Sequence, residues 1–454
     1  MPFIPHSQED KKTMLASIGV KNIEELFDEI PATLKEMDIN ILPEQISEQE
    51  LVRLMTQRQP SSNDLCFIGA GAYSHYIPAA VWELTRRGEF YTAYTPYQAE
   101  ASQGGLQVIY EFQTAIAELM AMEASNASLY DGATALAEAI FMAVRVHRSK
   151  KTQIIIPGNI HPKYLEVIKT ALKYQNIQLN NISYEKNTGK IDLNSYKQAL
   201  SSNTAAVVIA QPNFFGSIED TDQLVNLAHD NNSLVIAQVN PIAMSLIQPP
   251  GLWGNNGADI SCGEGQPLGI PLAMGGPYFG FMCTKMKHIR QMPGRIVGKT
   301  KDNKGTNCYT LTLQTREQHI RRAKATSNIC TNQGLMVTAA TIFMTLLGTK
   351  GMLNIAKQSH ANALTLQQEL CSIPNTRLVF DAPFFNEFVL EFNSKTNILD
   401  ALQDFNIQGG FDLSNTHIDF PNNTILICAT EQNISTDITR YQQAITSILQ
   451  RETA

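Results

Sequence analysis

The sequence predicts an α/β protein in three parts: a helical arm over residues 1–60, a large α/β domain over 61–334 and a small α+β domain over 335–454. Three observations predict this arrangement. Prolines interrupt the amphipathic segments near the N-terminus, short apolar runs alternate with helical segments through the middle of the chain, and the rhythm changes after residue 335. We therefore expect a mostly parallel, buried sheet, with a functional site at the carboxyl ends of its strands.

The arm comes first in the chain. Residues 10–18, 23–29 and 47–57 are amphipathic, and Pro31 and Pro43 separate them. Each piece is too short to form a hydrophobic core alone. We expect the arm to pack on the main body or on a partner chain.

The large domain is predicted from short apolar runs that alternate with helical segments. The expected strands cover residues 153–157, 205–210, 234–237, 259–262 and 278–283, and the expected helices cover 134–146, 162–174 and 222–230. Such alternation is typical of parallel strands joined by helical crossovers.

The small domain begins with an apolar helix over residues 335–347, which leads into a second helix ending near residue 371. Strands are expected over 377–380, 387–392 and 424–429, and helices over 398–405 and 436–449. Few strands among several helices predict an α+β unit.

The composition excludes several classes of protein. The chain has 454 residues, and 42 acidic against 35 basic side chains give a formal net charge of −7. Hydrophobic residues make up 43% and charged residues 17%, which excludes a mostly disordered chain. The acidic excess argues against nucleic acid and anionic membranes as partners, because both require a dominant basic surface.

Cysteine usage bears on the compartment. The 7 cysteines are scattered, and none lies in C-x-x-C spacing, which favours reduced thiols over a disulfide framework or a metal cluster. The N-terminus has no basic region followed by an apolar run, and the sequence has no uncharged apolar stretch long enough to span a bilayer. We therefore expect a cytoplasmic protein.

Several loops could carry a site. The segment 67–76 is rich in Gly and Tyr but lacks the context of a dinucleotide site, so a tight loop is the simpler interpretation. The polar segment 94–105 is typical of a surface or a site. Asp131 and His161 each precede a predicted helix and could face a ligand, although a helix cap is the commoner explanation. The segment 263–277, dense in Gly and Pro, is either backbone that approaches something closely or a crossover loop.

Residues 292–299 and 314–329 hold the strongest concentration of basic side chains in the chain. Guanidinium and hydroxyl groups together suit a phosphate or a carboxylate. A solvated helix face followed by a cap, with Thr326, Ser327 and Asn328 all able to cap, fits the same residues. Composition alone does not decide between the two interpretations.

These segments resemble one known family. Residues 94–98, 102–104, 292–295 and 314–331 are similar to the glycine dehydrogenase (decarboxylating) family, the P-protein of the glycine cleavage system. The resemblance covers essentially the whole chain, and the chain length is similar to that of the separate α chain, subunit 1, in the two-chain form of this oxidoreductase. The motif at 314–331 is long and specific.

The resemblance implies a fold-type I pyridoxal-phosphate architecture and a reaction. Glycine loses its carboxyl group as CO₂, and the aminomethyl group passes to the lipoyl group of the carrier H-protein, with the cofactor as the electron sink. The implied partners are the β chain (subunit 2), the lipoylated H-protein, and the T- and L-proteins of the same system.

This sequence departs from the family's catalytic half at two positions. A lysine there holds the cofactor aldehyde, and a carboxylate faces the pyridine nitrogen. Counting back from residues 275–277 puts the lysine position at Gln266, whose amide cannot form an imine. Counting back from residues 250–251 puts the carboxylate position at Ala237. The resemblance therefore implies a chain that is inactive alone, with pyridoxal phosphate held by the β chain.

The resemblance also implies that this chain completes its partner's site in trans. The candidates to reach the cofactor phosphate are Thr326, Ser327 and Asn328, and the candidates to line the glycine pocket are Tyr94, Tyr97, Gln98 and Ser102. The basic candidates, which could contact an anion or the carrier, anchor their loop or form an interchain ion pair, are Arg316, Arg321 and Arg322. Gln266 and His161 would lie in a vestigial pocket.

Two alternatives remain open at this stage. A self-sufficient pyridoxal-phosphate enzyme would need another lysine, such as Lys285 or Lys287, although both lie beyond the glycine-rich loop. A non-catalytic, anion-binding scaffold protein would use the basic segment as its contact surface.

Overall fold

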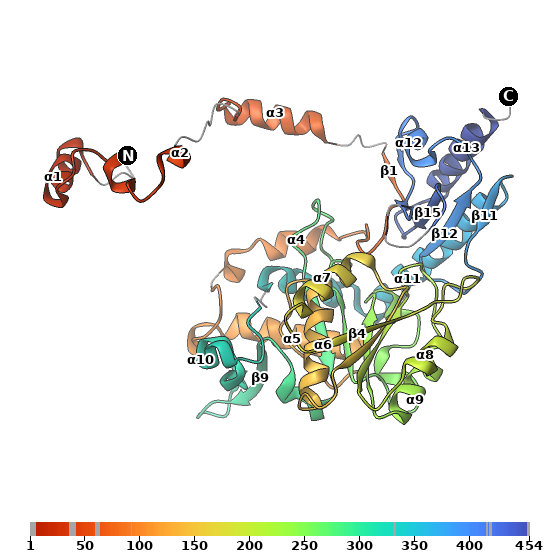
Figure 1. The fold of residues 1–454 in the computed structure, drawn as a ribbon, viewed down its shortest axis with the longest axis horizontal. Helices are drawn as coiled ribbons and strands as arrows, with labels where there is room; N and C mark the ends of the chain where they lie inside the picture. Colours follow the sequence, from red (N-terminus) through yellow and green to blue (C-terminus); the bar gives the residue numbers. More distant parts are fainter. Residues whose placement is uncertain are drawn as a thin grey trace. The chain divides into compact units, whose positions relative to one another are not determined.

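The computed structural model describes residues 6–35, 42–59, 64–91, 93–329, 333–414, 416 and 420–451. The chain forms two compact units, Met1–Ser62 and Asn63–Ala454, each of which is described by itself (Figure 1). The predicted division of the second unit into a large domain (61–334) and a small domain (335–454) stays a prediction.

The first unit is a chain of short helices: α1 (Gln8–Ile18), η1 (Glu24–Phe27), α2 (Ala32–Lys35) and α3 (Glu48–Arg58). Capping boxes begin the two longer helices, with Ser7 paired to Asp10 and Ser47 paired to Glu50. Neither α1 nor α3 contains a buried residue. The helices predicted over 10–18 and 47–57 are confirmed, whereas 23–29 contains only a short 3₁₀ turn.

A seven-stranded sheet forms the centre of the second unit. Its strands are β2 (Ala124–Ser125), β3 (Gln153–Pro157), β4 (Gln178–Ile182), β5 (Thr204–Gln211), β6 (Leu234–Val239), β7 (Ile260–Glu264) and β8 (Gly280–Thr284), in the order β2-β8-β7-β6-β5-β3-β4. The five strands from β4 to β7 run parallel, and β8 and β2 are antiparallel to their neighbours. The expected mostly parallel sheet is confirmed.

Both faces of this sheet are buried. The helices in the part of the chain that forms this sheet are α4 (Ala79–Thr85), α5 (Gln103–Leu119), α6 (Gly132–Val146), α7 (Pro162–Leu172), α8 (Leu193–Ala199) and α9 (Thr221–Asp230) (Figure 1). Successive residues of β6 enter different core clusters: Val235 and Ala237 lie in one, and Leu234 and Ile236 in the other. Burial on both faces explains why these strands are continuous apolar runs.

A second, four-stranded antiparallel sheet follows, in the order β11-β12-β15-β14. Its strands are β11 (Thr376–Leu378), β12 (Glu387–Phe392), β14 (Phe411–Asp412) and β15 (Thr424–Cys428), packed with α12 (Ile398–Gln403) and α13 (Ser435–Arg451). The short strand β1 (Leu65–Cys66) pairs in parallel with β13 (Ile407–Gln408), so the first residues of the predicted large domain belong to this part of the fold.

The helix α11 (Gly334–Cys371) connects the two sheets. Its backbone is non-helical at Gly348, with φ 59° and ψ −175°, so it consists of two helices across a kink, as the sequence predicts. Within the described part of the chain, α11 is the one helix long and apolar enough to meet the composition test for a membrane span, and half of that window is buried inside the protein.

Candidate functional site

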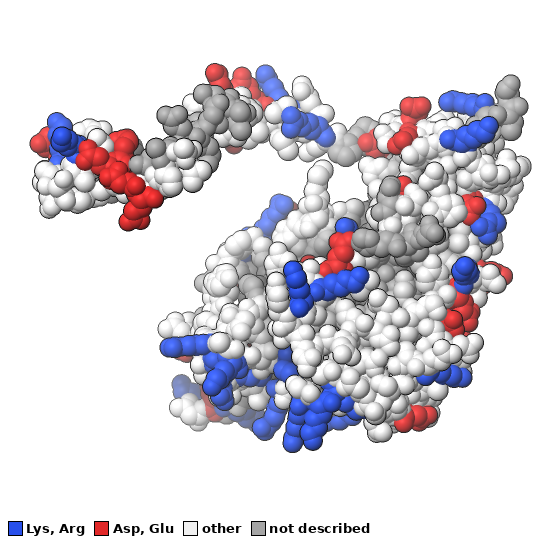
Figure 2. All heavy atoms as spheres, in the orientation of Figure 1, with Lys and Arg blue, Asp and Glu red and all other residues white. Residues whose placement is uncertain are grey.

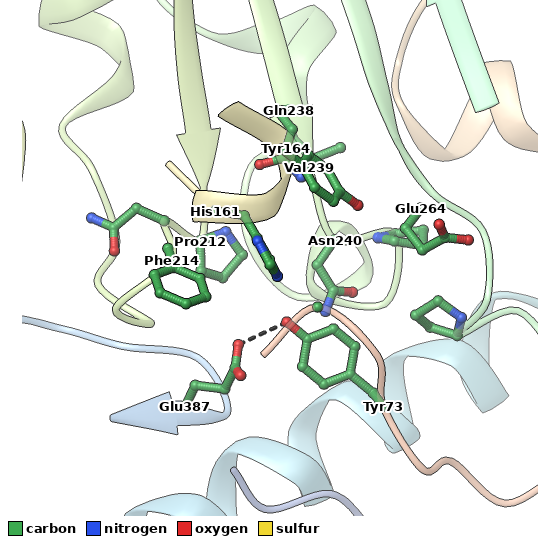
Figure 3. A pocket seen from close by; sticks show the side chains of 14 residues that line it. Tyr73, His161, Tyr164, Pro212, Phe214, Gln238, Val239, Asn240, Glu264 and Glu387 are labelled. Atoms are coloured by element: carbon green, nitrogen blue, oxygen red, sulfur yellow. Dashed lines mark hydrogen bonds between the residues drawn. The ribbon is translucent and has the colours of Figure 1, made fainter. Parts of the chain in front are cut away.

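A small pocket, here called the inner pocket, lies where the parallel strands end, as expected for this fold. Its walls include Pro212 after β5, Val239 at the end of β6, Glu264 at the end of β7, and Glu387 at the start of β12. The cavity is about 50 Å³, room for a few water molecules. Figure 3 shows the side chains of His161, Tyr73, Asn240 and Glu387 around it.

Glu264 places a carboxyl group at the start of α6. Its Oε2 accepts a hydrogen bond from the backbone N–H of Gly132, the first residue of that helix, at 3.0 Å, and its Oε1 accepts from the N–H of Gln266 at 3.0 Å. A helix N-terminus is an anion site because its first N–H groups are unpaired and its dipole is positive there. Burial raises the pKa of Glu264 to about 7. An internal carboxyl group thus occupies the place of a bound anion.

Glu387 fastens the glycine-rich loop 67–76 from the other side. Its Oε1 accepts from the backbone N–H of Ala70 at 2.7 Å, and its Oε2 accepts from the hydroxyl of Tyr73 at 2.7 Å. The side chain is buried, and burial raises the pKa of Glu387 to about 7. The loop is therefore closed over the inner pocket by a carboxyl group with neutral partners.

Gln266 also holds this loop, by hydrogen bonds to its backbone. Its Oε1 accepts from the backbone N–H of Tyr73 at 2.8 Å, and its Nε2 donates to the carbonyl oxygens of Tyr73 at 2.9 Å and Ile270 at 2.8 Å. Only 1% of the residue is exposed. The amide at the predicted lysine position therefore cross-links two loops, and its donors and its acceptor are already used.

Ala237 lies within β6, fully buried in the hydrophobic core. The next two residues, Gln238 and Val239, line the inner pocket, whereas Ala237 does not. The strand Leu234–Val239 contains no carboxylate that could face a pyridine nitrogen. The wall of the pocket on this strand is thus an amide and an isopropyl group.

The inner pocket does not fit pyridoxal phosphate. Among the described residues that line it, none is a lysine or an arginine, so neither the aldehyde nor the phosphate finds a cationic partner. Glu264 already occupies the N-terminus of α6, where a phosphate would meet a carboxyl group. No step of a pyridoxal-phosphate reaction can therefore be assigned to this pocket.

His161 and Asp131 both act as helix caps, which confirms the simpler interpretation of each. The Nδ1 atom of His161 accepts from the N–H of Lys163 at 3.1 Å, so the Nε2 atom, 2.9 Å from the Ala70 carbonyl oxygen, is the donor there. Burial lowers the pKa of His161. The Oδ1 atom of Asp131 accepts from the N–H of Thr134 at 2.8 Å. His161 also lines the inner pocket, as the resemblance implies.

Lys285 and Lys287 lie at the opposite end of the sheet. They line a cleft together with Asp259 and with Leu234, the first residue of β6, whereas Val239 at the other end of that strand lines the inner pocket. Five residues of strand separate the two sites by about 17 Å. The Nζ atom of Lys285 is 2.9 Å from Oδ1 of Asp259. Neither lysine can therefore serve at the predicted lysine position, Gln266.

The second group of candidates meets at another place, where the loop 94–102 approaches the basic segment. The hydroxyl of Tyr97 accepts from the guanidinium of Arg295 at 3.2 Å, and the Tyr97 ring lies 5.0 Å from the ring of His319. Tyr94 and Gln98 are exposed, and Ser102 is half-buried before α5.

Figure 2 shows Lys and Arg side chains gathered over α10 (Gln318–Arg321) and β9 (Ile296–Lys301). The β9–β10 hairpin, with β10 at Asn307–Thr312, is absent from the sequence-based expectation.

The three predicted arginines differ in their surroundings. The guanidinium of Arg316 donates to the carbonyl oxygens of Met292 and, at 2.7 Å, of Gly294, so it anchors the preceding loop. Arg321 is exposed and donates from Nε to the carbonyl oxygen of Thr315 at 2.9 Å. Arg322 is also exposed. Anchoring therefore accounts for Arg316, while the other two arginines face solvent.

The predicted phosphate-contacting residues form the end of the same loop. The N–H of Thr326 donates to the carbonyl oxygen of Arg316 at 2.9 Å. The hydroxyl of Ser327 donates to Oε1 of Glu138 at 2.9 Å and accepts from the N–H of Ile329 at 3.2 Å. Asn328 is exposed. The rest of the motif, residues 330 and 331, lies outside the described residues.

Three acidic residues at these sites are absent from the sequence-based predictions: Glu138, Glu264 and Glu387. Glu138 is the only acidic residue in the apolar helix α6, and that isolation is a usable signal. Glu264 was visible only as part of a glycine-rich loop. Glu387 opens a strand of the other sheet, and nothing in its local sequence indicates that it contacts residue 70.

Comparisons with known proteins agree with one another along the whole chain. A family model described as "Glycine cleavage system P-protein" matches residues 1–445. The chain is 53% identical over 451 residues to "Probable glycine dehydrogenase (decarboxylating) subunit 1" of Coxiella burnetii (strain Dugway 5J108-111), covering 99% of this chain and 100% of the relative. It is 51% identical over 457 residues to the protein of the same description from Legionella pneumophila (strain Corby), covering 100% of both.

Solved structures show the same likeness. A crystal structure of glycine decarboxylase (P-protein) in inhibitor-bound form matches with a TM-score of 0.85 and 36% identity, covering 99% of this chain and 100% of that chain. Sphingosine-1-phosphate lyase of Burkholderia pseudomallei K96243 matches with a TM-score of 0.66 and 14% identity, covering 92% and 93%. The second likeness shows the fold alone, a fold-type I pyridoxal-phosphate architecture.

Proposed function

Because the chain belongs to the glycine cleavage system P-protein family, we propose that it is subunit 1 of a two-chain glycine dehydrogenase (decarboxylating). In this proposal the chain is inactive alone. A homologous subunit 2 holds pyridoxal phosphate, and this chain completes the active site of that partner from outside.

The proposal is supported by Gln266: the residue predicted to occupy the lysine position of an active chain is an amide, and three hydrogen bonds fix it. The inner pocket also lacks a cation among the described residues that line it, and it holds two carboxyl groups, Glu264 and Glu387. A chain with the fold but without the lysine can contribute to the reaction only through another chain.

The proposed contribution lies in the two loops that meet around Tyr97 and Arg295. These loops carry hydroxyl, amide and guanidinium groups, which are suited to bind a phosphate or a carboxylate of the partner's ligands. In this proposal Thr326 and Asn328 reach toward the cofactor phosphate of subunit 2. The segment with Tyr94, Tyr97, Gln98 and Ser102 closes the glycine site, orients the substrate and excludes water.

The proposal includes the later partners of the reaction. The aminomethyl group left after decarboxylation passes to the lipoyl group of the H-protein, and the T- and L-proteins act on that carrier. The exposed Arg321 and Arg322 are the members of the basic set that remain available for a contact with a carrier or an anion. The assembly works in the cytoplasm.

The test starts with the purified chain alone. Pyridoxal phosphate is added, and visible absorption is measured before and after borohydride reduction. We expect neither a cofactor band nor a reduced lysine adduct. Addition of subunit 2 should then give decarboxylation of glycine, measured as release of labelled CO₂. A stable band with one modified lysine on this chain would contradict the proposal, as would full activity of subunit 2 without this chain.

A further inference from the structure

The loop that ends in Thr326, Ser327 and Asn328 rests on one buried carboxyl group. Glu138, on the second turn of α6, is 6% exposed, and its Oε1 accepts from the hydroxyl of Ser327 at 2.9 Å. Ser327 then accepts from the N–H of Ile329 at 3.2 Å. A serine hydroxyl has a single proton, so in this arrangement Ser327 has none left to donate to a ligand.

The surroundings of Glu138 show a site built around charged groups. Buried side-chain atoms without a hydrogen-bond partner occur in Glu138 (Oε2), Arg145 (Nε), Arg316 (Nε), Arg295 (Nε) and Glu317 (Oε1). Arg145 lies two turns after Glu138 on α6 and donates to the carbonyl oxygen of Gln291 at 3.0 Å. Burying a carboxyl oxygen without a hydrogen-bond partner costs free energy. This cost indicates that Glu138 has a function at this position.

From these contacts we propose that Glu138 is a positioning residue, which acts through Ser327 to hold the turn of Thr326 and Asn328 in the orientation that reaches the partner subunit's cofactor. Ser327 is then a tether and not itself a phosphate ligand. This inference rests on the proposed function and deepens it, because it assigns separate roles to three adjacent residues. The carboxyl group touches neither substrate nor cofactor.

The physical basis is the strength and the location of one hydrogen bond. Burial raises the pKa of Glu138, and the nearby Arg145 guanidinium and the Ser327 hydroxyl act against that rise. A bond between a hydroxyl and a buried acceptor is directional, so it fixes the side chain of Ser327 and, through the Ile329 N–H, the backbone that follows. The backbone N–H of Thr326 has a second anchor, the carbonyl oxygen of Arg316, so hydrogen bonds hold the turn at both of its ends.

The first measurement uses the full-length chain alone, and amide hydrogen exchange is read at single residues. In Glu138→Leu we expect at least tenfold faster exchange at Ile329, whose acceptor is Ser327, and an unchanged rate at Thr326, whose acceptor is Arg316. Glu138→Gln keeps the Oε1 acceptor and should restore slow exchange. Glu369→Gln, an exposed carboxylate of α11, is the matched control. Equal exchange at Ile329 in all four proteins would overturn the positioning role.

The second measurement uses the assembled two-chain enzyme, and pyridoxal phosphate binding is titrated by visible absorption. Glu138→Leu and Ser327→Ala should each weaken binding about tenfold, and the double variant should be no weaker than the single ones, because both remove the same bond. Glu138→Gln should bind within about twofold of the unmodified chain. A double variant whose loss of binding equals the product of the two single losses would overturn the proposal.

Two reference variants separate this inference from the proposed function. Thr326→Ala and Asn328→Ala remove the groups that are proposed to reach the cofactor, and they leave Glu138 and Ser327 in place. If neither variant changes cofactor binding while Glu138→Leu still loosens the Ile329 amide, the contact in trans is wrong and the tether is real. If both weaken binding while Glu138→Leu has no effect, the tether is wrong and the contact in trans stands.

Discussion

The amide of Gln266, at the predicted lysine position, has a structural role. The three hydrogen bonds of Gln266 join the loop 67–76 to the loop after β7, and that junction closes the inner pocket. A lysine at this position would remove these bonds and place an ammonium group beside a pocket that has no cationic partner for a phosphate among the described residues that line it. A single substitution therefore cannot return this chain to the catalytic form of the fold.

We predict that Gln266→Lys destabilises the chain without creating a cofactor site. The free energy of unfolding should fall by about 4 kcal/mol, because three buried partners lose their hydrogen bonds and a charge is buried. Gln358→Lys, at an exposed position of α11, should change it by no more than about 0.5 kcal/mol. Urea unfolding gives both values. A borohydride-stable cofactor adduct at position 266 would show that the pocket is more adaptable than its contacts indicate.

Glu387 should make stability depend on pH. Its pKa is about 7 in the folded chain against an ordinary value of 4.5, because burial favours the neutral form. Between these two values the folded state binds more protons at this group than the unfolded state. The contribution of Glu387 to stability therefore falls as the pH rises from about 4.5 to about 7 and is then constant. The full effect is about 3 kcal/mol.

The variant Glu387→Gln isolates this effect, because an amide does not titrate. Relative to the unmodified chain, we expect the variant to gain about 2–3 kcal/mol in free energy of unfolding between pH 5 and pH 8. Urea unfolding at the two pH values measures the change. Glu369→Gln should give curves parallel to those of the unmodified chain. Parallel curves for Glu387→Gln as well would mean that this carboxyl group ionises normally.

At the scale of elements, hydrophobic periodicity predicted the strands and helices whose pattern is set by their own local sequence. The strands β3, β5 and β6 are apolar runs because both of their faces are buried, and the break in α11 follows from its glycine. The strand β4 is at the sheet edge and carries polar residues, so it lacks that signal. The hairpin of β9 and β10 was hidden by basic and polar residues whose faces are half-exposed. Contacts between distant segments, such as Glu387 with Ala70, leave no periodic pattern.

The kink in α11 provides a test at this scale. Gly348 has φ 59° and ψ −175°, a conformation that is essentially restricted to glycine. Gly348→Ala should therefore lower the free energy of unfolding by about 1–3 kcal/mol, although no atom lies near the added methyl group. Gly104→Ala, in the first turn of α5 with equally open space, should raise it by about 0.5 kcal/mol. Thermal unfolding distinguishes them, and equal shifts of the same sign would contradict the backbone argument.

At the scale of the whole molecule, the chain has the architecture of a fold-type I enzyme, but no lysine or arginine is among the described residues that line its inner pocket. The ends of the parallel strands border the inner pocket, and carboxyl and amide groups of the chain itself line it. The loop with Thr326 and Asn328 lies elsewhere, held by Glu138 through Ser327 and by the carbonyl oxygen of Arg316. The sequence resemblance names candidate residues at both places, and their roles stay predictions. The internal contacts that close one place and support the other required the structure.

This division of roles predicts the cofactor stoichiometry of the assembled enzyme. Each pair of one subunit 1 and one subunit 2 should bind one pyridoxal phosphate, because the proposed function gives a cofactor lysine to subunit 2 alone. Borohydride reduction followed by mass spectrometry of the separated chains should place the adduct on subunit 2 alone. Lys285→Gln should leave the loading unchanged, since Lys285 lies at the far end of the sheet and pairs with Asp259. Two cofactors per pair, or an adduct on this chain, would mean that the inner pocket opens in the assembly and that Glu264 leaves the start of α6.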